Sequence, residues 1–505
     1  MQEPAFLDDA LTHWAATSPD ATALHFVGAA TSYGALEKAA DHLAAHLISL
    51  GVSRGDRVVV YAAKSPNVIA AVYAIIRIGA IYVPLDPSAP QERLNTLIAA
   101  TTPAALMADP ARVTLLATQH TSMKRVNLES ELPEPASPDV VRARALERSS
   151  DDPAYILMTS GSTGTPKGIC HTHKSGLAYA KMAAKRCDLT QTDRVSHHTP
   201  LHFDMSIFDV FSTALAGAMC VIIPEMYAKI PASLAKLVQD ARITVWYSVP
   251  YALIQMTERG ALDTRDFSAL RIIMLAGERI PPAALKTFSH HAPNATFLNA
   301  YGPTETNHCT TATFTHDALD GITPLSIGRP DDGVIARIGE GFLEDETGEL
   351  LIASEQVMRG YWNDPVRTDA TFTILTSADG ETRKYYRTGD LVSRDKAGNL
   401  VLLGRMDRQI KLRGYRIELD EIEHVLGRAP NVTEAAVIVK DDALYGFVCG
   451  PADLDITALN AYAAAHLPAY AVPACITGLT QLDRTSTGKI DRNALATRRH
   501  DIATA

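Results

Sequence analysis

Hydrophobic positions along most of the chain alternate between two periods. Apolar residues recur at helical spacing over residues 35–50, 67–78 and 231–241. Short apolar runs rich in β-branched and aromatic residues, typical of strands, cover residues 57–61, 82–85, 155–158, 221–223, 244–247, 270–275 and 296–298. Strands that alternate with helices predict α/β architecture, with parallel sheets covered by helices.

The pattern changes over the last hundred or so residues. Strand-like runs at 400–403, 434–439 and 445–449 surround one short helical segment at 419–426, which predicts a small α+β domain. The Gly/Arg-rich segment 404–408 separates the two patterns. We therefore expect a large N-terminal domain over residues 1–405 and a smaller C-terminal domain over residues 406–505.

Composition excludes several classes of protein. With 47% hydrophobic and 21% charged residues, the chain can bury a sizeable core, and its net charge of -10 does not favour a nucleic-acid binder. The 6 cysteines form no CxxC pair, which disfavours zinc and favours a reduced, cytoplasmic protein. The N-terminus lacks the pattern of a signal peptide, and no apolar run is long enough to predict a membrane span.

Residues 159–168 (TSGSTGTPKG) form the sharpest local feature and follow a predicted strand. Glycines let backbone N–H groups face an anion, hydroxyls add donors, and a lysine adds positive charge. The candidate phosphate-binding residues are Thr159, Ser160, Gly161, Ser162, Thr163, Gly164 and Lys167. The spacing differs from the GxxxxGK[ST] loop, and composition alone favours a polar surface loop.

The order of these residues adds information. The string YILMTSGSTGTPKG at 155–168 resembles the phosphate-loop signature of the adenylate-forming superfamily, which includes acyl-CoA synthetases, luciferases and the adenylation domains of nonribosomal peptide synthetases. Further blocks resemble that family's motifs in the same order, at residues 299–305, 349–362, 386–390, 404–411, 411–423 and 483–492. The chain is identified as a member of this superfamily.

The resemblance implies a large N-terminal domain of two α/β sheets plus a small β barrel, and a mobile C-terminal domain. It also implies that a carboxylate is joined to the α-phosphate of ATP and that pyrophosphate is expelled. Because two anions must meet, positive charge is needed between them. Lys489 matches the family's catalytic lysine, although in any other sequence it would be interpreted as a solvated loop lysine.

The remaining nucleotide residues follow from the same resemblance. Thr304 matches the hydroxyl that contacts the α-phosphate, and Glu305 matches the Mg²⁺ ligand, the alternative being an acid at a helix N-terminus. Tyr301, after Ala300, would stack on adenine. Asp390 would accept hydrogen bonds from the ribose hydroxyls, and Arg405 would reach the ribose or the phosphates.

Asp407 matches the family's hinge position, about which the C-terminal domain rotates between the two half-reactions. This rotation would exchange the Lys489 loop for the face formed by residues 411–416. The resemblance therefore implies domain alternation.

The segment HFDMS at residues 202–206 indicates the class of substrate. Amino-acid-activating members carry an aspartate at the position of Asp204, where it pairs with the substrate ammonium; the alternative is a helix cap ahead of Ser206. The family's pocket positions fall on Asp204, Met205, Phe208, Ser248, Met274, Ala276, Ala300, His308, Cys309 and Lys489.

These positions indicate a small or mid-sized neutral amino acid. The runs at 246–250 and 302–310 resemble those of prolyl and related aminoacyl ligases, so L-proline is preferred, with alanine, glycine and serine close behind. His308 is unusual at a position that is often aliphatic. It could donate to a polar substrate group or pack as a neutral imidazole, and the sequence leaves both open.

Nothing after residue 496 resembles a carrier domain, so we expect a free-standing enzyme that serves a separate acyl or peptidyl carrier protein through its phosphopantetheine thiol, in nonribosomal peptide or other natural-product biosynthesis. The main alternative is an acyl-CoA ligase that activates a small carboxylic acid. A third hypothesis is a degenerate domain that binds nucleotide without catalysis. Amino-acid-dependent ATP–pyrophosphate exchange separates the three.

Overall fold

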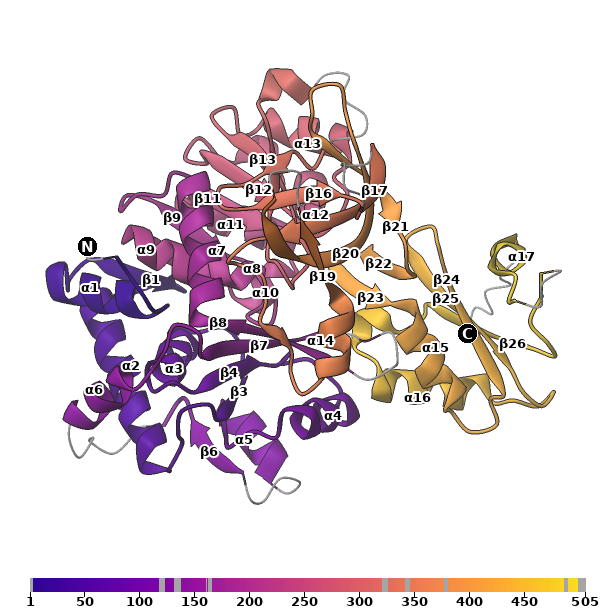
Figure 1. Ribbon diagram of the computed structural model, residues 1–505, viewed down its shortest axis with the longest axis horizontal. Coiled ribbons are helices and arrows are strands. Elements are labelled where there is room, and N and C mark those ends of the chain that lie inside the picture. Colours follow the sequence, from indigo (N-terminus) through magenta and orange to yellow (C-terminus); the bar gives the residue numbers. More distant parts are fainter. Residues whose placement is uncertain are drawn as a thin grey trace. The chain divides into compact units, whose positions relative to one another are not determined.

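A computed structural model describes residues 3–117, 123–130, 138–159, 161, 166–319, 326–340, 346–376, 380–485 and 489–497. The chain forms two compact units (Figure 1). The larger comprises Met1–Pro87, Thr102–Leu157 and Gly168–Met406. The smaller comprises Ser88–Thr101, Met158–Lys167 and Asp407–Ala505.

A nine-stranded sheet forms one layer of the larger unit. Its strands, in order across the sheet, are β15 (Arg329–Pro330), β14 (Thr310–Phe314), β13 (Thr296–Tyr301), β12 (Ile272–Leu275), β11 (Val245–Ser248), β9 (Arg194–His197), β10 (Met219–Ile222), β1 (Thr22–Phe26) and β2 (Ala29–Ser32). From β13 to β1 neighbouring strands are parallel, and the remaining pairs are antiparallel.

The two faces of this sheet enter different cores because side chains alternate along each strand. Trp246, Ile273 and Phe297 pack in one core with helices α11 (Pro231–Asp240), α12 (Pro250–Arg259) and α13 (Pro282–Ser289) (Figure 1). Tyr247 and Met274 face the other way, into the largest core. That core also contains side chains of α2 (Tyr33–Ser49), α3 (Pro66–Arg77) and α7 (His173–Arg186).

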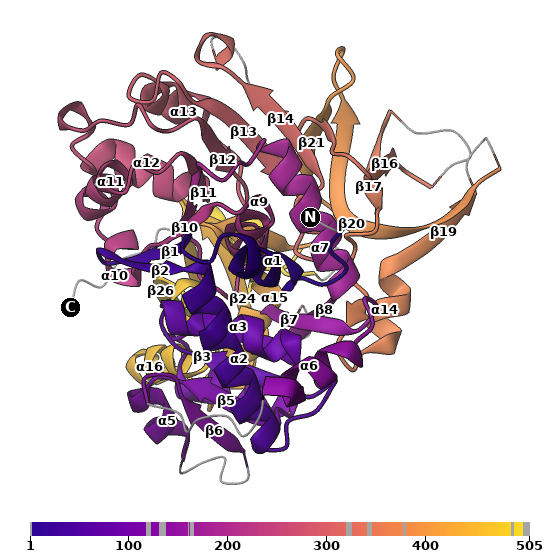
Figure 2. The same ribbon diagram turned by 90° about the vertical axis from the view of Figure 1, so that its left-hand side faces the viewer.

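A seven-stranded sheet contributes to the same large core. Its order is β18 (Gly360–Tyr361), β8 (Lys167–Thr172), β7 (Pro153–Thr159), β4 (Ile81–Pro84), β3 (Arg57–Tyr61), β5 (Ala105–Ala108) and β6 (Lys124–Asn127). β7, β4, β3, β5 and β6 are parallel neighbours. Figure 2 shows α2 and α3 beside β3 and β5.

Helix α3 is apolar on all sides and is buried from Val68 to Arg77, as expected for a helix enclosed within a core. Ser65 caps its first turn, accepting a hydrogen bond from the Val68 N–H, and Pro66 occupies the first helical position. At the other end, buried Arg77 pairs with Asp8, Glu37 and Asp41. Three carboxylates thus compensate the cation that the core encloses.

The larger unit also contains an antiparallel five-stranded sheet, whereas the family resemblance predicts a small β barrel in this domain. It consists of β16 (Ile335–Ile338), β17 (Thr347–Ala353), β20 (Thr382–Arg394), β19 (Phe372–Thr376) and β21 (Leu400–Arg405). The long strand β20 pairs with β19 through its first half and with β21 through its second.

The smaller unit is an α+β assembly. A hairpin of β22 (Gln409–Leu412) and β23 (Tyr415–Glu418) precedes a three-stranded sheet of β24 (Glu434–Lys440), β25 (Ala443–Cys449) and β26 (Cys475–Leu479). Helices α15 (Leu419–Gly427) and α16 (Ile456–His466) contribute apolar side chains to its core. No helix within the described ranges is long and apolar enough to cross a membrane.

The α/β fold class is confirmed, and each strand or helix predicted from periodicity falls on an observed element of the same type. The boundaries differ by a few residues: the helix expected at 35–50 spans Tyr33–Ser49, and the strand expected at 296–298 extends to Tyr301. Helix α16 was not predicted, and neither was the π-helical segment Phe208–Ser212.

Candidate active site

The strand β13 leads directly into a tight turn that carries three candidate residues. Tyr301 ends the strand, and residues 304–306 form a turn rather than a helix, so Glu305 is not an acid at a helix N-terminus. A Cβ atom on Gly302 would lie 1.8 Å from the carbonyl oxygen of Asn307. Only glycine therefore lets the chain fold back this closely.

The side chain of Asp390, which is predicted to bind the ribose, is held by two neighbouring side chains within the larger unit. Asp390 on β20 lies opposite Arg405 on β21, and the Arg405 Nη1 donates to the Asp390 Oδ1 at 2.7 Å. The Tyr301 hydroxyl donates to the other carboxylate oxygen. Burial, together with the nearby Asp390 charge, raises the pKa of Tyr301 well above 10, so its hydroxyl remains a donor. The structure thus brings together Tyr301, Asp390 and Arg405, although residues 301 and 405 are 104 positions apart in the sequence.

Glu305 is fully buried, and one of its carboxylate oxygens accepts a hydrogen bond from the Tyr361 hydroxyl at 2.9 Å. The carbonyl of neighbouring Thr304 lies 3.0 Å from His171 Nε2. Burial lowers the pKa of His171 to about 4, so the ring is neutral near pH 7. Because a carbonyl only accepts, Nε2 carries the proton, and the ring holds the turn at Thr304.

The phosphate loop is only partly described. Ser160, Ser162, Thr163 and Gly164 lie outside the described residues. Thr159 ends β7, Gly161 is buried, and Lys167 begins β8. Within the smaller unit, the Lys167 Nζ lies 3.8 Å from Glu418 Oε1.

The two C-terminal candidates belong to the smaller unit. Lys489 is exposed, and its carbonyl accepts a hydrogen bond from the Thr485 N–H at 2.8 Å. Asp407 is the first residue of this unit's last segment, immediately after Met406 of the larger unit. Its Oδ1 accepts from the Gln409 N–H at 3.1 Å.

Asp204 lies half-buried at the start of the short helix α8 (Met205–Ile207), but its side chain makes no capping hydrogen bond. Asp204 therefore occupies the N-cap position of α8 without capping it through its side chain. Its carboxylate lies close enough to Tyr155, Tyr179 and Tyr247 that its charge adds to burial in raising their pKa values. Asp204 thus lies near a group of buried tyrosines.

Most of the predicted pocket positions gather at the carboxyl ends of parallel strands, where α/β sheets bind ligands. Ser248 on β11 lies opposite Leu275 on β12, which lies opposite Asn299 on β13. Met205, Phe208, Met274, Ala276 and Ala300 share the largest core. Ser248 is also buried, and its hydroxyl accepts from Trp246 Nε1 at 2.8 Å.

Tyr179 and Tyr247 belong to this group although sequence analysis assigned neither to the pocket. Tyr179 pairs edge-to-face with His308, and Tyr247 does so with Phe208, at ring-centroid distances of 5.1 and 5.4 Å. Tyr247 lies in the run 246–250 that resembled prolyl ligases, so that signal could have identified it. Tyr179, on α7, carries no comparable signal.

His308 is enclosed, with its Nδ1 3.2 Å from the Tyr179 hydroxyl and its Nε2 3.8 Å from Asp331 Oδ2. Burial lowers the pKa of His308, so the structure favours a neutral imidazole. The adjacent Cys309 packs instead in a separate cluster with Tyr301 and Ile327. His308 therefore lies with the tyrosines, and Cys309 lies with Tyr301.

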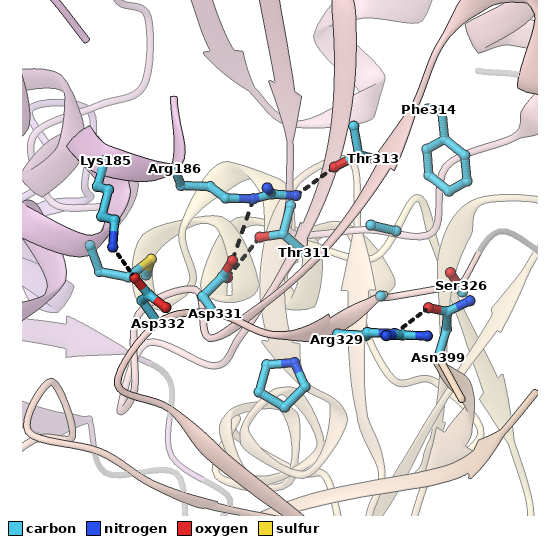
Figure 3. Close-up of a pocket in the computed structure, with 14 residues that line it drawn as sticks. Lys185, Arg186, Thr311, Thr313, Phe314, Ser326, Arg329, Asp331, Asp332 and Asn399 are labelled. Atoms are coloured by element: carbon cyan, nitrogen blue, oxygen red, sulfur yellow. Dashed lines mark hydrogen bonds and ion pairs between the residues drawn. The ribbon is translucent and has the colours of Figure 1, made fainter. Parts of the chain in front are cut away.

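A cavity of ≈ 550 Å³ lies beyond Asp331, along β14 and β15 (Figure 3). Its charged side chains already have partners: Lys185 pairs with Asp332, and Arg186 approaches Asp331 at 3.5 Å. Arg329 donates to the Asn399 Oδ1 at 3.3 Å. The cavity thus offers a ligand no unpaired charge among these residues, and none of the predicted site residues lines it.

Comparisons with known proteins show the family of the chain. Residues 11–362 match the AMP-binding enzyme family, and residues 421–489 match the AMP-binding enzyme C-terminal domain. The chain is 33% identical to an L-proline–(L-prolyl-carrier protein) ligase of Pseudomonas fluorescens, covering 97% of this chain and 98% of that one. It is 34% identical to a ligase of the same name from Streptomyces coelicolor, covering 93% and 92%.

The solved structure of amide bond synthetase McbA from Marinactinospora thermotolerans is similar throughout. Its TM-score is 0.83 at 25% identity, with 97% of this chain and 99% of that chain covered. The family predicted from the motifs is confirmed. The chain belongs to the AMP-binding enzyme family and is an ATP-dependent, AMP-forming ligase.

Proposed function

We propose that this ligase activates a small neutral α-amino acid, L-proline first, as its aminoacyl-adenylate and transfers the acyl group to the phosphopantetheine thiol of a carrier protein. The observation that carries the proposal is Asp204, a half-buried carboxylate at the start of α8 that makes no capping hydrogen bond and whose charge raises the pKa values of the buried Tyr179 and Tyr247. A carboxylate in such surroundings is stabilised by a cation, and a substrate ammonium supplies one.

The choice of L-proline rests on two supports. The pocket positions Met205, Phe208 and Met274 are apolar, and Ala276 and Ala300 are small, which suits a compact apolar side chain. Two relatives that match over nearly the full length of both chains are named as L-proline ligases, and each name includes a carrier protein. Alanine, glycine and serine remain the alternatives that a substrate panel tests.

The nucleotide would be held by the larger unit. Asp390 would accept from the ribose hydroxyls while Arg405 and Tyr301 hold it, and the Thr304 hydroxyl would contact the α-phosphate. The described residues contain no cluster of three or more metal-ligating side chains. A single carboxylate, Glu305, fits Mg²⁺, which is commonly bound by one or two carboxylates together with substrate phosphates. Bound there, Mg²⁺ would neutralise phosphate charge.

Lys489 would supply the positive charge between the substrate carboxylate and the α-phosphate. Because Lys489 belongs to the smaller unit, the proposal requires that unit to present it to the nucleotide and later to withdraw it, with Asp407 as the hinge. The thiol would then attack the adenylate carbonyl, with AMP as the leaving group.

Amino-acid-dependent ATP–pyrophosphate exchange tests the first half-reaction. We expect L-proline to give the highest kcat/KM in a panel of amino acids, and tetrahydrofuran-2-carboxylate, which lacks the ammonium, to give little or no exchange. Substituting Asp204→Asn should raise the KM for the amino acid by about a hundredfold and leave the KM for ATP unchanged, because the lost charge pair contributes about 2–3 kcal/mol. Exchange supported only by acids that lack an amino group would contradict the proposal and favour an acyl-CoA ligase.

Carrier transfer needs its own assay. We expect loading of radiolabelled proline onto a phosphopantetheinylated carrier and no comparable thioester with coenzyme A. The apo carrier, which lacks the thiol, is the matched control. Faster thioester formation on coenzyme A than on the carrier would overturn the second half of the proposal.

A further inference from the structure

A buried lysine outside every assigned motif contacts the backbone of residues 197–199. These residues begin the segment 197–209 that bears Asp204, Met205 and Phe208, called here the substrate loop. Lys64 follows β3 and immediately precedes Ser65, the cap of α3. Its Nζ donates to the carbonyls of three consecutive residues: His197 at 2.9 Å, His198 at 2.6 Å and Thr199 at 3.3 Å. Only 5% of the residue is exposed, and the three contacts use all three ammonium donors.

These contacts shape the chain where β9 ends at His197. In an extended strand, successive carbonyls point in opposite directions, so three consecutive carbonyls cannot reach one atom. Their convergence on Lys64 turns the chain out of the sheet and into residues 200–204, which end at Asp204. Lys64 therefore fixes the point from which the substrate loop departs.

The other end of the same loop is tied back to its beginning. Asp209, in the π-helical segment Phe208–Ser212, accepts from the Thr199 hydroxyl at 3.0 Å, and its carboxylate lies 3.0 Å from His197 Nδ1. Between these points the Ser206 hydroxyl lies 3.0 Å from the carbonyl of Leu201. The loop is thus closed on itself, with Asp204, Met205 and Phe208 on it.

We infer that Lys64 is a positioning residue for amino-acid recognition: by holding three carbonyls it sets where the Asp204 carboxylate meets the substrate ammonium. The inference rests on the function proposed above for Asp204. A 1 Å displacement of a positioned group is enough to reduce catalysis strongly, so loss of the Lys64 contacts should be felt at Asp204. The nucleotide residues Tyr301, Asp390 and Arg405 are not part of this loop and should be unaffected.

Lys64→Met retains the length of the side chain and removes its three donors. In ATP–pyrophosphate exchange, with the amino acid that the wild-type chain activates best, we expect the KM for that amino acid to rise at least about tenfold while the KM for ATP stays within about twofold. Lys64→Arg retains a cation with several donors and should restore part of the affinity. A loss of stability alone would not produce this split between the two substrates.

Arg77→Met is the matched control, because Arg77 is a buried cation at the opposite end of the same helix α3. Its partners are Asp8, Glu37 and Asp41, none of which lies on the substrate loop. We expect this variant to lose thermal stability at least as much as Lys64→Met, with both KM values of its folded fraction unchanged.

Thr199→Val gives a milder test if Lys64→Met does not fold, since it removes only the hydroxyl that donates to Asp209. It should raise the KM for the amino acid a few-fold and leave that for ATP unchanged. Equal changes in both KM values, or none in the folded variants, would overturn the inference. If the wild-type chain showed no exchange with any amino acid, the proposed function itself would fail, which is a distinguishable result.

Discussion

The proposed nucleotide end and the proposed amino-acid end of this site each present a carboxylate, but the two are organised differently. Asp390 is held through its side chain, by a guanidinium at 2.7 Å and by a tyrosine hydroxyl. Asp204 is carried on a loop whose backbone is held by Lys64. The Asp390 carboxylate is held by side chains, whereas the loop that bears Asp204 is held through its backbone. Substitutions near Asp390 should therefore act locally, whereas substitutions near Asp204 can act from a distance.

The largest expected effect comes from replacing Lys489, which would contact both the nucleotide phosphate and the amino-acid carboxylate. Lys489→Ala should slow adenylate formation about 1000-fold, about 4 kcal/mol, because it removes charge that is needed mainly in the transition state. The KM values for ATP and amino acid should change little. Single-turnover measurement of adenylate and of acyl transfer from preformed adenylate separates the steps. Transfer slowed as much as adenylation would show that Lys489 does not act in the first step alone.

Asp390→Asn tests the nucleotide end. The amide retains the shape but loses the charge that Arg405 contacts, so the KM for ATP should rise about 30- to 100-fold, about 2–3 kcal/mol. The KM for the amino acid should not change, which is the reverse of the result expected for Lys64→Met. Steady-state exchange kinetics with each substrate varied in turn would measure both. A parallel rise in both values would remove the distinction between the two ends.

Acidification should destabilise the fold through its buried neutral histidines. The unfolded pKa of His171 is 6.5 and its folded pKa is about 4, so below pH 6.5 the unfolded state binds a proton that the folded state does not. This contribution to stability is complete above pH 6.5 and is lost as the pH falls toward 4, by about 2 kcal/mol at pH 5. Urea unfolding of wild type and His171→Gln at pH 7 and 5 measures it. The variant should lose about 2 kcal/mol less than wild type, and an equal loss would contradict the assignment.

Tyr301→Phe should have the smallest effect at the nucleotide end. It removes only the hydroxyl that donates to Asp390 and keeps the ring, so the KM for ATP should rise about 3- to 10-fold, about 1 kcal/mol. Asp390 would still be held by Arg405. An effect as large as that of Asp390→Asn would mean that the hydroxyl, rather than the guanidinium, is what orders the carboxylate. The same exchange assay, run side by side on both variants, decides this.

The candidate nucleotide residues could be named from the sequence, whereas the packing around the site could not. Contiguous blocks such as 299–305 and 386–390 carry their own signature, so Tyr301, Glu305 and Asp390 could be named from them. Tyr179 and Lys64 could not be named, because their roles arise from packing. Lys64 is separated by 133 residues from the first carbonyl that it contacts, and nothing in its local sequence indicates that distant partner.

The same distinction applies to the secondary structure. Apolar runs predicted the strands β3, β10 and β11 and the helix α3, because elements that are buried on both faces have continuous hydrophobic sequences. The strand β20 was not predicted, since half of it is polar and its pairing changes from β19 to β21 along its length. The π-helical turn at Phe208–Ser212 has no residue pattern of its own and follows from the hydrogen bonds of the loop.

The glycine after Tyr301 has a consequence for protein engineering. A methyl group at position 302 would collide with the backbone carbonyl of Asn307. The backbone between Tyr301 and His308 is therefore constrained to the conformation that glycine allows. We therefore expect that directed evolution can vary the side chain at position 308 while the backbone that carries Tyr301 and Glu305 keeps its conformation. New amino-acid specificities should be sought by exchanging His308 together with Tyr179, and libraries that randomise residue 302 should yield inactive clones.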